Sequence, residues 1–255
     1  MLSHPENPLE LALSKAATEP AYRPEFYRLL LESQLFVLGE SDIEPDANGV
    51  LQSEASIQLI NITFENEYYI PIFSSLRRLE EYISGKESYL NFEAKAFFQF
   101  TKGSQFFLNP GSDYGKILKA GEIEGLLNGS LWRPNERIEV KEETEIFLGQ
   151  PSDYPHKLVD SLKLIFKEKK EVKRAYLARI FNPSSGDPGH ILIGIEISNE
   201  ADWDEVMKDT GFVAKEAMEG LIDFVRVNPL EKSSNSVSSY LINDTKPFFK
   251  RGFFG

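Results

Sequence analysis

The loop "NPSSGDPGH" holds the residue types of a hydrolytic triad. Ser184, Ser185, Asp187 and His190 all fall within it. A working triad needs a base that reaches the nucleophile and an acid that orients the base, and these groups normally come from separate elements of the fold. The G-x-S-x-G nucleophile elbow does not occur in this sequence. Because proline, serine, glycine and aspartate are ordinary hairpin residues, the sequence favours a turn over a catalytic loop.

The segment "GSDYGK", residues 111–116, offers a glycine-rich turn ahead of an expected helix. Backbone N–H groups in such a turn can bind a phosphate. A Walker A loop has four residues between its glycines and Ser or Thr after its lysine, whereas here three residues intervene and Ile117 follows Lys116. We therefore interpret the segment as a turn and not as a nucleotide site.

The histidine and cysteine content of the sequence does not indicate a metal site or a covalent mechanism. The histidines are His4, His156 and His190, with no pair at helical spacing and no carboxylate at metal-ligand spacing. The chain contains no cysteine, which excludes disulfides, thiolate zinc sites and cysteine nucleophiles. We accordingly expect no catalytic residue, no metal site and no cofactor.

The run "KEKKEVKR", residues 167–174, is the only dense basic stretch of the sequence. It spans the end of an expected helix, where lysine and arginine are stabilised by the helix dipole, so a structural role is favoured over anion binding. The chain as a whole has 40 acidic and 28 basic residues, a formal net charge of -12. That charge repels nucleic acid, which we do not expect as a partner.

The last ten residues, "KPFFKRGFFG", combine aromatic rings with positive charge, and they leave two interpretations open. In the first the rings cover the core, and in the second they dock on a partner protein or a second copy of the chain. The docking interpretation predicts that deleting residues 246–255 changes association and leaves thermal stability nearly unchanged. The candidate partner-binding residues of this segment are Phe248, Phe249, Phe253 and Phe254.

The stretch "LSKAATEPAYRPEFYRLLLES" predicts two helices around a proline hinge. Apolar residues recur at helical spacing before Pro20, and Pro24 is suited to the first turn of the second helix. Arg23, Tyr27 and Arg28 are candidate ligand- or partner-binding residues. A structural role is the alternative, because arginine beside tyrosine often stacks to fix the angle of a helix.

These candidates must be positioned by elements that alternate between helix and strand. The first half predicts the strand "QLFVLGE", a hairpin from "IQLINITFE" and "YYIPIFSS", and a helix capped by Ser74 or Ser75. Strand, helix, strand and helix then follow in "SYLNFE", "AKAFFQFTKG", "QFFLNP" and "ILKAGEIEGLLNG". This half is therefore expected to be an α+β domain, residues 1–141.

The second half, residues 142–255, predicts strand, helix, strand, strand, helix and strand. That β-α-β-β-α-β order is typical of the ferredoxin-like fold. The strands "RAYLARIF" and "HILIGIEI" should pair as antiparallel neighbours, and "VSSYLINDTKPFF" predicts an appended helix. The fold class expected for the chain is α+β in two modules, of which the C-terminal one is ferredoxin-like.

The sequence begins without a basic segment followed by an apolar run, and no window approaches the roughly 18 apolar residues of a membrane span. We expect a cytoplasmic protein that does not use a membrane.

Several segments resemble the SseB family, which is named for enhanced serine sensitivity. They are "LSKAATEPAYRPEFYRLLLES", "IPIFSSLRRLEEYI", "FFLNPGSDYGK", "LVDSLKLIFKEKKEVKRAYLARI" and "ILIGIEI". The resemblance covers nearly the whole chain and implies an N-terminal and a C-terminal SseB domain. It implies no enzymatic activity and carries over no catalytic residue.

Three functions remain open at this point. The favoured one is a non-catalytic protein that binds a protein partner or a small ligand and modulates amino-acid physiology. The alternative is an enzyme, a hydrolase or transferase, that acts through carboxylates and arginines in a cleft between the two modules. Purely structural self-association is a third.

Overall fold

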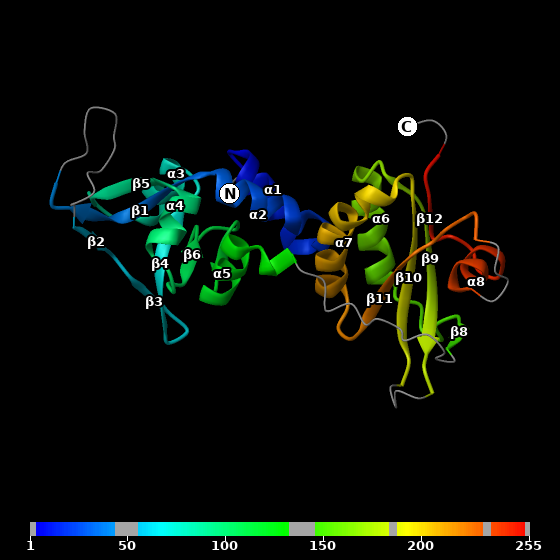
Figure 1. The fold of residues 1–255 in the computed structure, drawn as a ribbon. Helices are drawn as coiled ribbons and strands as arrows, with labels where there is room; N and C mark the ends of the chain where they lie inside the picture. The colour runs from blue at the N-terminus through cyan, green and yellow to red at the C-terminus, as the bar shows by residue number, and fades with distance from the viewer. Residues whose placement is uncertain (1–3, 44–55, 133–145, 184–187, 232–235, 253–255) are drawn as a thin grey trace. The chain divides into compact units, whose positions relative to one another are not determined.

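The computed structural model describes residues 4–43, 56–132, 146–183, 188–231 and 236–252. The chain divides into two compact units, an N-terminal unit of residues 1–18 and 22–131 and a C-terminal unit of residues 19–21 and 132–255. Each unit packs helices against a sheet, which confirms the α+β class (Figure 1). The predicted boundary between residues 141 and 142 lies outside the described residues. No helix in the described ranges has the length and hydropathy needed to cross a membrane.

The N-terminal unit begins with two helices and continues through strands that alternate with short helices. Its helices and strands are α1 (Pro8–Thr18), α2 (Arg23–Glu32), β1 (Gln34–Ser41), β2 (Ile57–Leu59), β3 (Ile62–Phe64), β4 (Glu67–Phe73), α3 (Leu76–Tyr82), β5 (Tyr89–Glu93), α4 (Ala94–Phe100), β6 (Phe106–Leu108), β7 (Lys116–Leu118) and α5 (Ala120–Asn128). The predicted cap of α3 is confirmed, because Ser75 accepts a hydrogen bond from the backbone N–H of Arg78.

The sheet of this unit has the order β2-β1-β4-β6-β7, with β3 paired to β4 and β5 paired to β1. Strands β4 and β6 are parallel neighbours. On one face, Phe97 and Phe98 of α4 lie 5.7 and 4.9 Å from the Phe106 ring of β6. On the other face, Leu79 of α3 packs with Phe73 of β4. The sheet is therefore covered by helices on both sides, and its apolar residues face both ways.

The segment predicted as one strand, "IQLINITFE", is two strands in the structure. Strand β2 pairs with β1, and β3 pairs with β4 in a hairpin that turns at Glu65 and Asn66. Both turn residues have positive φ, 50° and 65°, which is the backbone geometry of the tight turns that match strand twist. The start of the predicted helix "ILKAGEIEGLLNG" also differs, because residues 116–118 pair with β6 as strand β7.

The C-terminal unit contains the elements β8 (Phe147–Gly149), α6 (His156–Glu168), β9 (Val172–Phe181), β10 (His190–Ile197), α7 (Trp203–Ala217), β11 (Ile222–Arg226), α8 (Val237–Asn243) and β12 (Phe249–Lys250). Strands β9 and β10 pair antiparallel over almost their full length, as the sequence predicted for "RAYLARIF" and "HILIGIEI". Short 3₁₀ turns complete the chain at Pro20–Tyr22, Ser130–Trp132 and Glu200–Asp202.

The ferredoxin-like arrangement is not confirmed. That fold places its first strand between the third and the fourth, whereas β10 and β11 pair directly and in parallel. The described strand order is β11-β10-β9-β12, and β8 pairs with β9. Strand β8 is only three residues long and lies along the far end of β9, from Arg179 to Phe181. The order of elements along the chain was predicted correctly, but the pairing of the first strand was not.

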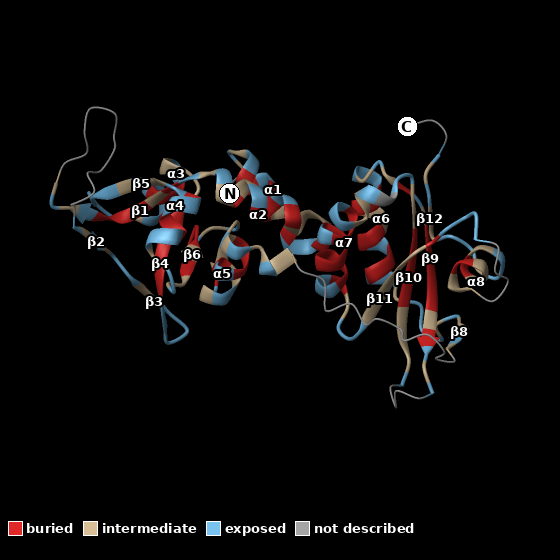
Figure 2. Cartoon of the chain, viewed as in Figure 1, coloured by how far each residue is buried: buried red, intermediate tan, exposed pale blue. Residues whose placement is uncertain are grey.

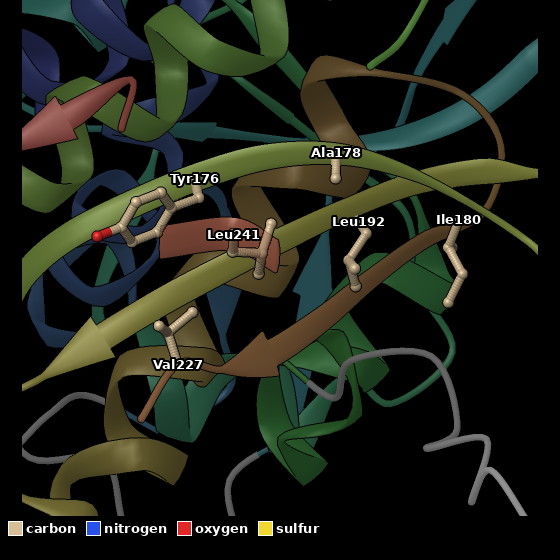
Figure 3. Packing of buried hydrophobic residues seen from close by; sticks show 6 residues of the cluster. All are labelled: Tyr176, Ala178, Ile180, Leu192, Val227 and Leu241. Atoms are coloured by element: carbon tan, nitrogen blue, oxygen red, sulfur yellow. The ribbon is translucent and has the colours of Figure 1, made fainter. Parts of the chain in front are cut away.

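The sheet of the C-terminal unit is also covered on both faces. Helices α6 and α7 pack together on one face, and α8 lies on the other (Figure 1). Beneath α8, side chains of β9 and β10 and of Val227, the residue after β11, meet Leu241 in one apolar cluster, as Figure 3 shows. Gly194 of β10 is required there, because a Cβ atom at this position would lie 2.4 Å from a Leu241 methyl carbon. Each unit has its own core of buried residues (Figure 2).

Candidate functional site

Two of the candidate residues of the α2 region, Arg23 and Arg28, bond to backbone carbonyls of α1 and α2. Arg23 Nε donates to the backbone carbonyl of Ala16 at 3.2 Å, so this arginine joins the start of α2 to the last turn of α1. Arg28 is exposed, and its Nε donates to the Pro24 carbonyl one turn earlier. Both arginines thus have contacts within or between the two helices, in line with the structural alternative.

Tyr27 contacts residues of α5 and β7. Its ring is buried, and its hydroxyl donates to the Glu122 carboxylate on α5. Lys116 of β7 binds the same carboxylate, with Nζ and Oε1 3.0 Å apart, and its ammonium lies 5.8 Å from the centre of the Tyr27 ring. This cluster joins α2, β7 and α5 on the surface of the N-terminal unit.

A second charged cluster lies beside the first. Lys119, the residue before α5, places its ammonium 2.5 Å from Glu67 Oε2 and 2.8 Å from the Tyr69 hydroxyl. The hydrogen bond to Lys119 lowers the pKa of the Glu67 carboxyl, and the bond to Glu67 raises the pKa of the Lys119 ammonium. Both charged side chains are about half exposed, so water competes with the pair.

The most enclosed polar constellation was not found in the sequence. Glu10 of α1 and Arg78 of α3 form a bidentate ion pair, with Nη2 to Oε2 at 2.8 Å and Nε to Oε1 at 3.1 Å. The two side chains are 0% and 1% exposed. A buried guanidinium and carboxylate in this fork geometry satisfy each other well. The pair fixes α1 to α3 and to the sheet beneath it.

The surroundings of this pair satisfy its remaining groups. Ser74 Oγ donates to Glu10 Oε1 at 2.6 Å, and Asn109 Nδ2 donates to Ser74 Oγ at 2.9 Å. Ser74 follows β4 and Asn109 follows β6, so both lie at the carboxyl ends of parallel strands. Ligands of open α/β sheets bind at such ends. Here the side chains of the protein itself occupy that position.

Glu10 and Arg78 each shift the pKa of the other toward the charged form. Burial alone would raise the pKa of the Glu10 carboxyl, but hydrogen bonds from Arg78 and Ser74 outweigh burial and hold that pKa below its usual value. The hydrogen bond to Glu10 raises the pKa of Arg78. Both groups are therefore ionised at neutral pH and paired with each other. The pair is closed to solvent, with its charged groups directed to each other and to Ser74.

One sequence signal could have revealed Glu10. It precedes Leu13 by three residues and so lies on the apolar face of the predicted first helix. A carboxylate in that position must find a buried partner. Nothing in the local sequence identifies Arg78 as that partner.

The triad candidates are only partly described. Ser184, Ser185 and Asp187 lie outside the described residues. His190 Nε2 and Asp223 Oδ2 of β11 form a hydrogen bond of 2.7 Å, so a carboxylate of another strand contacts this ring. No group of three metal-binding side chains occurs within the described ranges.

The C-terminal segment lies along the edge of the sheet. Phe248 N donates to the Ala175 carbonyl and Arg251 N donates to the Lys173 carbonyl, each at 2.9 Å, which adds β12 to β9. The Phe248 and Phe249 rings are partly buried and lie 6.3 and 5.6 Å from the Phe166 ring of α6. These two candidates therefore pack within the unit. Phe253 and Phe254 lie outside the described residues.

Arg251 completes this attachment. Its guanidinium donates to the carbonyls of Phe166 at 2.5 Å, Lys169 at 2.7 Å and Val172 at 2.9 Å. Carbonyls at the end of a helix have no intrahelical partner, and a cation is stabilised there by the helix dipole. Arg251 thus caps α6 from a distant part of the sequence.

The C-terminal unit has a shallow cavity of about 180 Å³ beside the last residues of β10 and β11. It is lined by Ile197, Arg226, Val227, Asn228 and Pro229. Ligand pockets for small molecules usually have about 300–1,000 Å³. The cavity is thus smaller than a typical metabolite site.

The fold and these contacts define a protein of two α+β units with an internally paired polar centre in the first unit. The chain belongs to the SseB family: the SseB protein N-terminal domain matches residues 9–125 and the SseB protein C-terminal domain matches residues 140–251. It is 32% identical over 262 residues to Protein SseB of Escherichia coli (strain K12), covering 100% of this chain and 96% of that protein. Protein SseB of Shigella flexneri matches with the same identity and coverage. No solved structure matches the chain.

Proposed function

We propose that this member of the SseB family is a non-catalytic protein that binds a partner protein or a second copy of itself. Its setting is the cytoplasm, and its role lies in amino-acid physiology, as the family resemblance implies. The contact surface includes the C-terminal segment with Phe253 and Phe254. The exposed side of α2, with Arg28, is a second contact region.

The closed Glu10–Arg78 pair is the observation that carries this proposal. An enzyme acting through carboxylates and arginines needs them where a substrate can reach them, whereas these two side chains are 0% and 1% exposed. Their hydrogen bonds are directed to each other and to Ser74. The group best suited to such chemistry by residue type is therefore committed to the interior. Binding needs only exposed surface, which supports the non-catalytic function.

A capture experiment with matched variants tests the proposal. The immobilised full chain and its Phe253→Ser/Phe254→Ser variant are incubated with cell extract, and bound proteins are quantified by mass spectrometry. We expect the variant to lose a partner that the unchanged chain retains, or to sediment as a smaller species. Its melting temperature should stay the same, since β12 and Arg251 are untouched.

The control variant removes exposed aromatic rings elsewhere. Tyr68 and Phe100, which are 73% and 67% exposed, are both replaced by serine. This variant should capture and sediment like the unchanged chain. Equal capture and sedimentation for all three proteins would contradict a binding role for the segment. Conversion of a metabolite by the purified protein, detected in a metabolite mixture, would contradict the non-catalytic assignment.

A further inference from the structure

Strand β12 brings two basic stretches together that are far apart in the sequence. Lys250 lies opposite Arg174 in the β9–β12 ladder, and the backbone N–H of Arg251 bonds to the carbonyl of Lys173. The guanidinium of Arg251 also contacts the carbonyl of Lys169 at the end of α6. The stretches 167–174 and 246–251 therefore lie side by side at this edge of the sheet.

This region has the opposite charge from the rest of the molecule. The two stretches contain eight basic and two acidic residues, which leaves 20 basic and 38 acidic residues elsewhere in the chain. A positive region on a strongly negative protein attracts anionic groups and repels cationic ones. In the sequence these basic residues lie in two separate stretches, and each stretch was interpreted on its own.

Five lysines of this region are exposed to solvent, and we call them the basic surface: Lys167, Lys170, Lys173, Lys246 and Lys250. None of them has a described carboxylate within 4.0 Å. Two other basic residues of the region form ion pairs with described carboxylates. Lys169 binds Asp209 at 2.7 Å and Arg174 binds Glu196 at 3.2 Å.

Acidic residues in the same stretches are fewer than the lysines. Glu168 is exposed, and Glu171 is partly buried beside Val172. Outside the two stretches, Asp244 is exposed just before Lys246, and Glu205 of α7, which is 74% exposed, lies 3.9 Å from the Lys169 ammonium. With five exposed ammonium groups against these carboxylates, the basic surface keeps a positive excess.

We propose that the basic surface binds an acidic segment, rich in Asp and Glu, of a partner protein. The inference rests on the proposed binding function and deepens it by naming the chemistry of the partner. Lysine ammonium groups on flexible stems adapt to carboxylates of an extended chain without requiring one geometry. Complementary charge of this kind speeds association and selects the partner.

The aromatic rings favour a polypeptide over a nucleic acid or a membrane. Single-stranded nucleic acids stack bases on exposed rings, and membrane surfaces take up aromatic side chains beside lysines. Phe248 and Phe249 are partly buried and contact Phe166 of α6, so neither ring is presented for these purposes.

Binding of labelled poly-L-glutamate to the full chain, followed by fluorescence anisotropy at low and high salt, tests the inference. We expect saturable binding that weakens as salt screens the charges. The variant Lys170→Glu/Lys173→Glu/Lys250→Glu should bind about tenfold or more weakly, because each exposed charge pair contributes a factor of a few. The control Lys86→Glu/Lys95→Glu/Lys102→Glu makes the same change in net charge in the N-terminal unit and should bind like the unchanged chain.

Each outcome decides the matter. Equal binding by the two variants would overturn the inference, and so would tighter binding of a DNA oligonucleotide or of phosphatidylserine vesicles than of poly-L-glutamate. Circular dichroism verifies that both variants are folded, and substitution of the same lysines by glutamine replaces the first variant if it is not. Absence of poly-L-glutamate binding, combined with partner capture that depends on Phe253 and Phe254, would overturn this inference alone and leave the proposed function standing.

Discussion

Arg78 and Arg251 each attach one segment of the chain to its unit, but they bind different partners. Arg78 holds α1 through the buried carboxylate of Glu10. Arg251 holds β12 through neutral backbone carbonyls at the end of α6, and it remains partly exposed. The first attachment needs a second charge in the interior, whereas the second uses groups that every helix end provides.

The difference decides what happens when one partner is lost. Without Glu10, the Arg78 guanidinium would be a buried charge without its main counterion, which is strongly destabilising. Without Arg251, water can reach the freed carbonyls of α6, and the loss is limited to the hydrogen bonds themselves. Mutations at the two attachments therefore allow two losses of unfolding free energy to be measured separately: that from a buried charge without a counterion and that from a helix end without its cap.

Replacing Glu10 by glutamine tests the larger of these effects. Glutamine keeps the size of the side chain but removes its charge, so we expect a loss of about 3 kcal/mol or more in the free energy of unfolding. Urea unfolding followed by circular dichroism measures it. The control is Glu81→Gln, which removes a partly exposed carboxylate 3.0 Å from the same guanidinium and should cost less than about 1 kcal/mol. Equal losses for both variants would refute the distinction.

Arg251→Ala should have the next largest effect. Hydrogen bonds that involve a charged group contribute about 1.5–3 kcal/mol, so we expect a loss of about 2 kcal/mol from the C-terminal unit. Arg251→Lys should recover part of it, because one ammonium cannot reach all the carbonyls. Hydrogen exchange of the α6–β9 peptides locates the change, and Lys250→Ala, on an exposed neighbour, is the control. A variant as stable as the unchanged chain would show that β12 is not held by Arg251.

These contacts revise the sequence-based expectation for the C-terminal segment. Deletion of residues 246–255 removes β12 and Arg251 together, so it should lower thermal stability as well as affect association.

Lowering the pH should weaken the attachment of α1 through Glu10 and Arg78 gradually, whereas a mutation removes it at once. The pKa of Glu10 is lower in the folded state than its ordinary value of 4.5. Its contribution is therefore fully present above about pH 4.5 and is lost as pH falls through the lower, folded pKa. A single group changes stability by at most about 1.4 kcal/mol per pH unit. The difference in unfolding free energy between the unchanged chain and Glu10→Gln should shrink below pH 4.5, and a constant difference would contradict this assignment.

The smallest effect is expected for His190→Ala. It removes one partly exposed hydrogen bond to Asp223, which contributes about 1 kcal/mol or less. Partner capture should be unchanged in this variant and in Ser185→Ala, because the loop is interpreted as a hairpin connection. Loss of binding in both variants with the fold retained would restore the triad hypothesis.

Local signals in the sequence predicted most elements but few of their partners. The proline-hinged helices, the cap at Ser75 and the β9–β10 hairpin all follow from spacing and turn residues within short windows. The break between β2 and β3 was missed although the alternation of "IQLINITFE" shifts phase at Leu59 and Ile60, where the segment changes from pairing with β1 to pairing with β4. Order along the chain also suggested the ferredoxin-like fold, whereas the position of β8 depends on contacts across the sheet.

The candidate site shows the same limit. Tyr27 was identified, but its partners Glu122 and Lys116 come from elements about ninety residues further along the chain. Phe248 and Phe249 were identified as well, and their role changed once β9 was found beside them. Burial of Glu10 and Arg78 depends on residues from four separate elements, which no local pattern contains.

The position of β12 in the chain also sets the order in which the two units can be completed during synthesis. Strands and helices of the N-terminal unit end with α5 at Asn128, so this unit can assemble while the residues that follow are still being added. The C-terminal unit cannot close in the same way. The first turn of α6 is made early, but the carbonyls at its other end wait for Arg251, more than eighty residues later. Until β12 has been synthesised, the edge of β9 near Ala175 has no strand beside it. In the ribosome-bound chain, another strand or a chaperone can bind to this open edge.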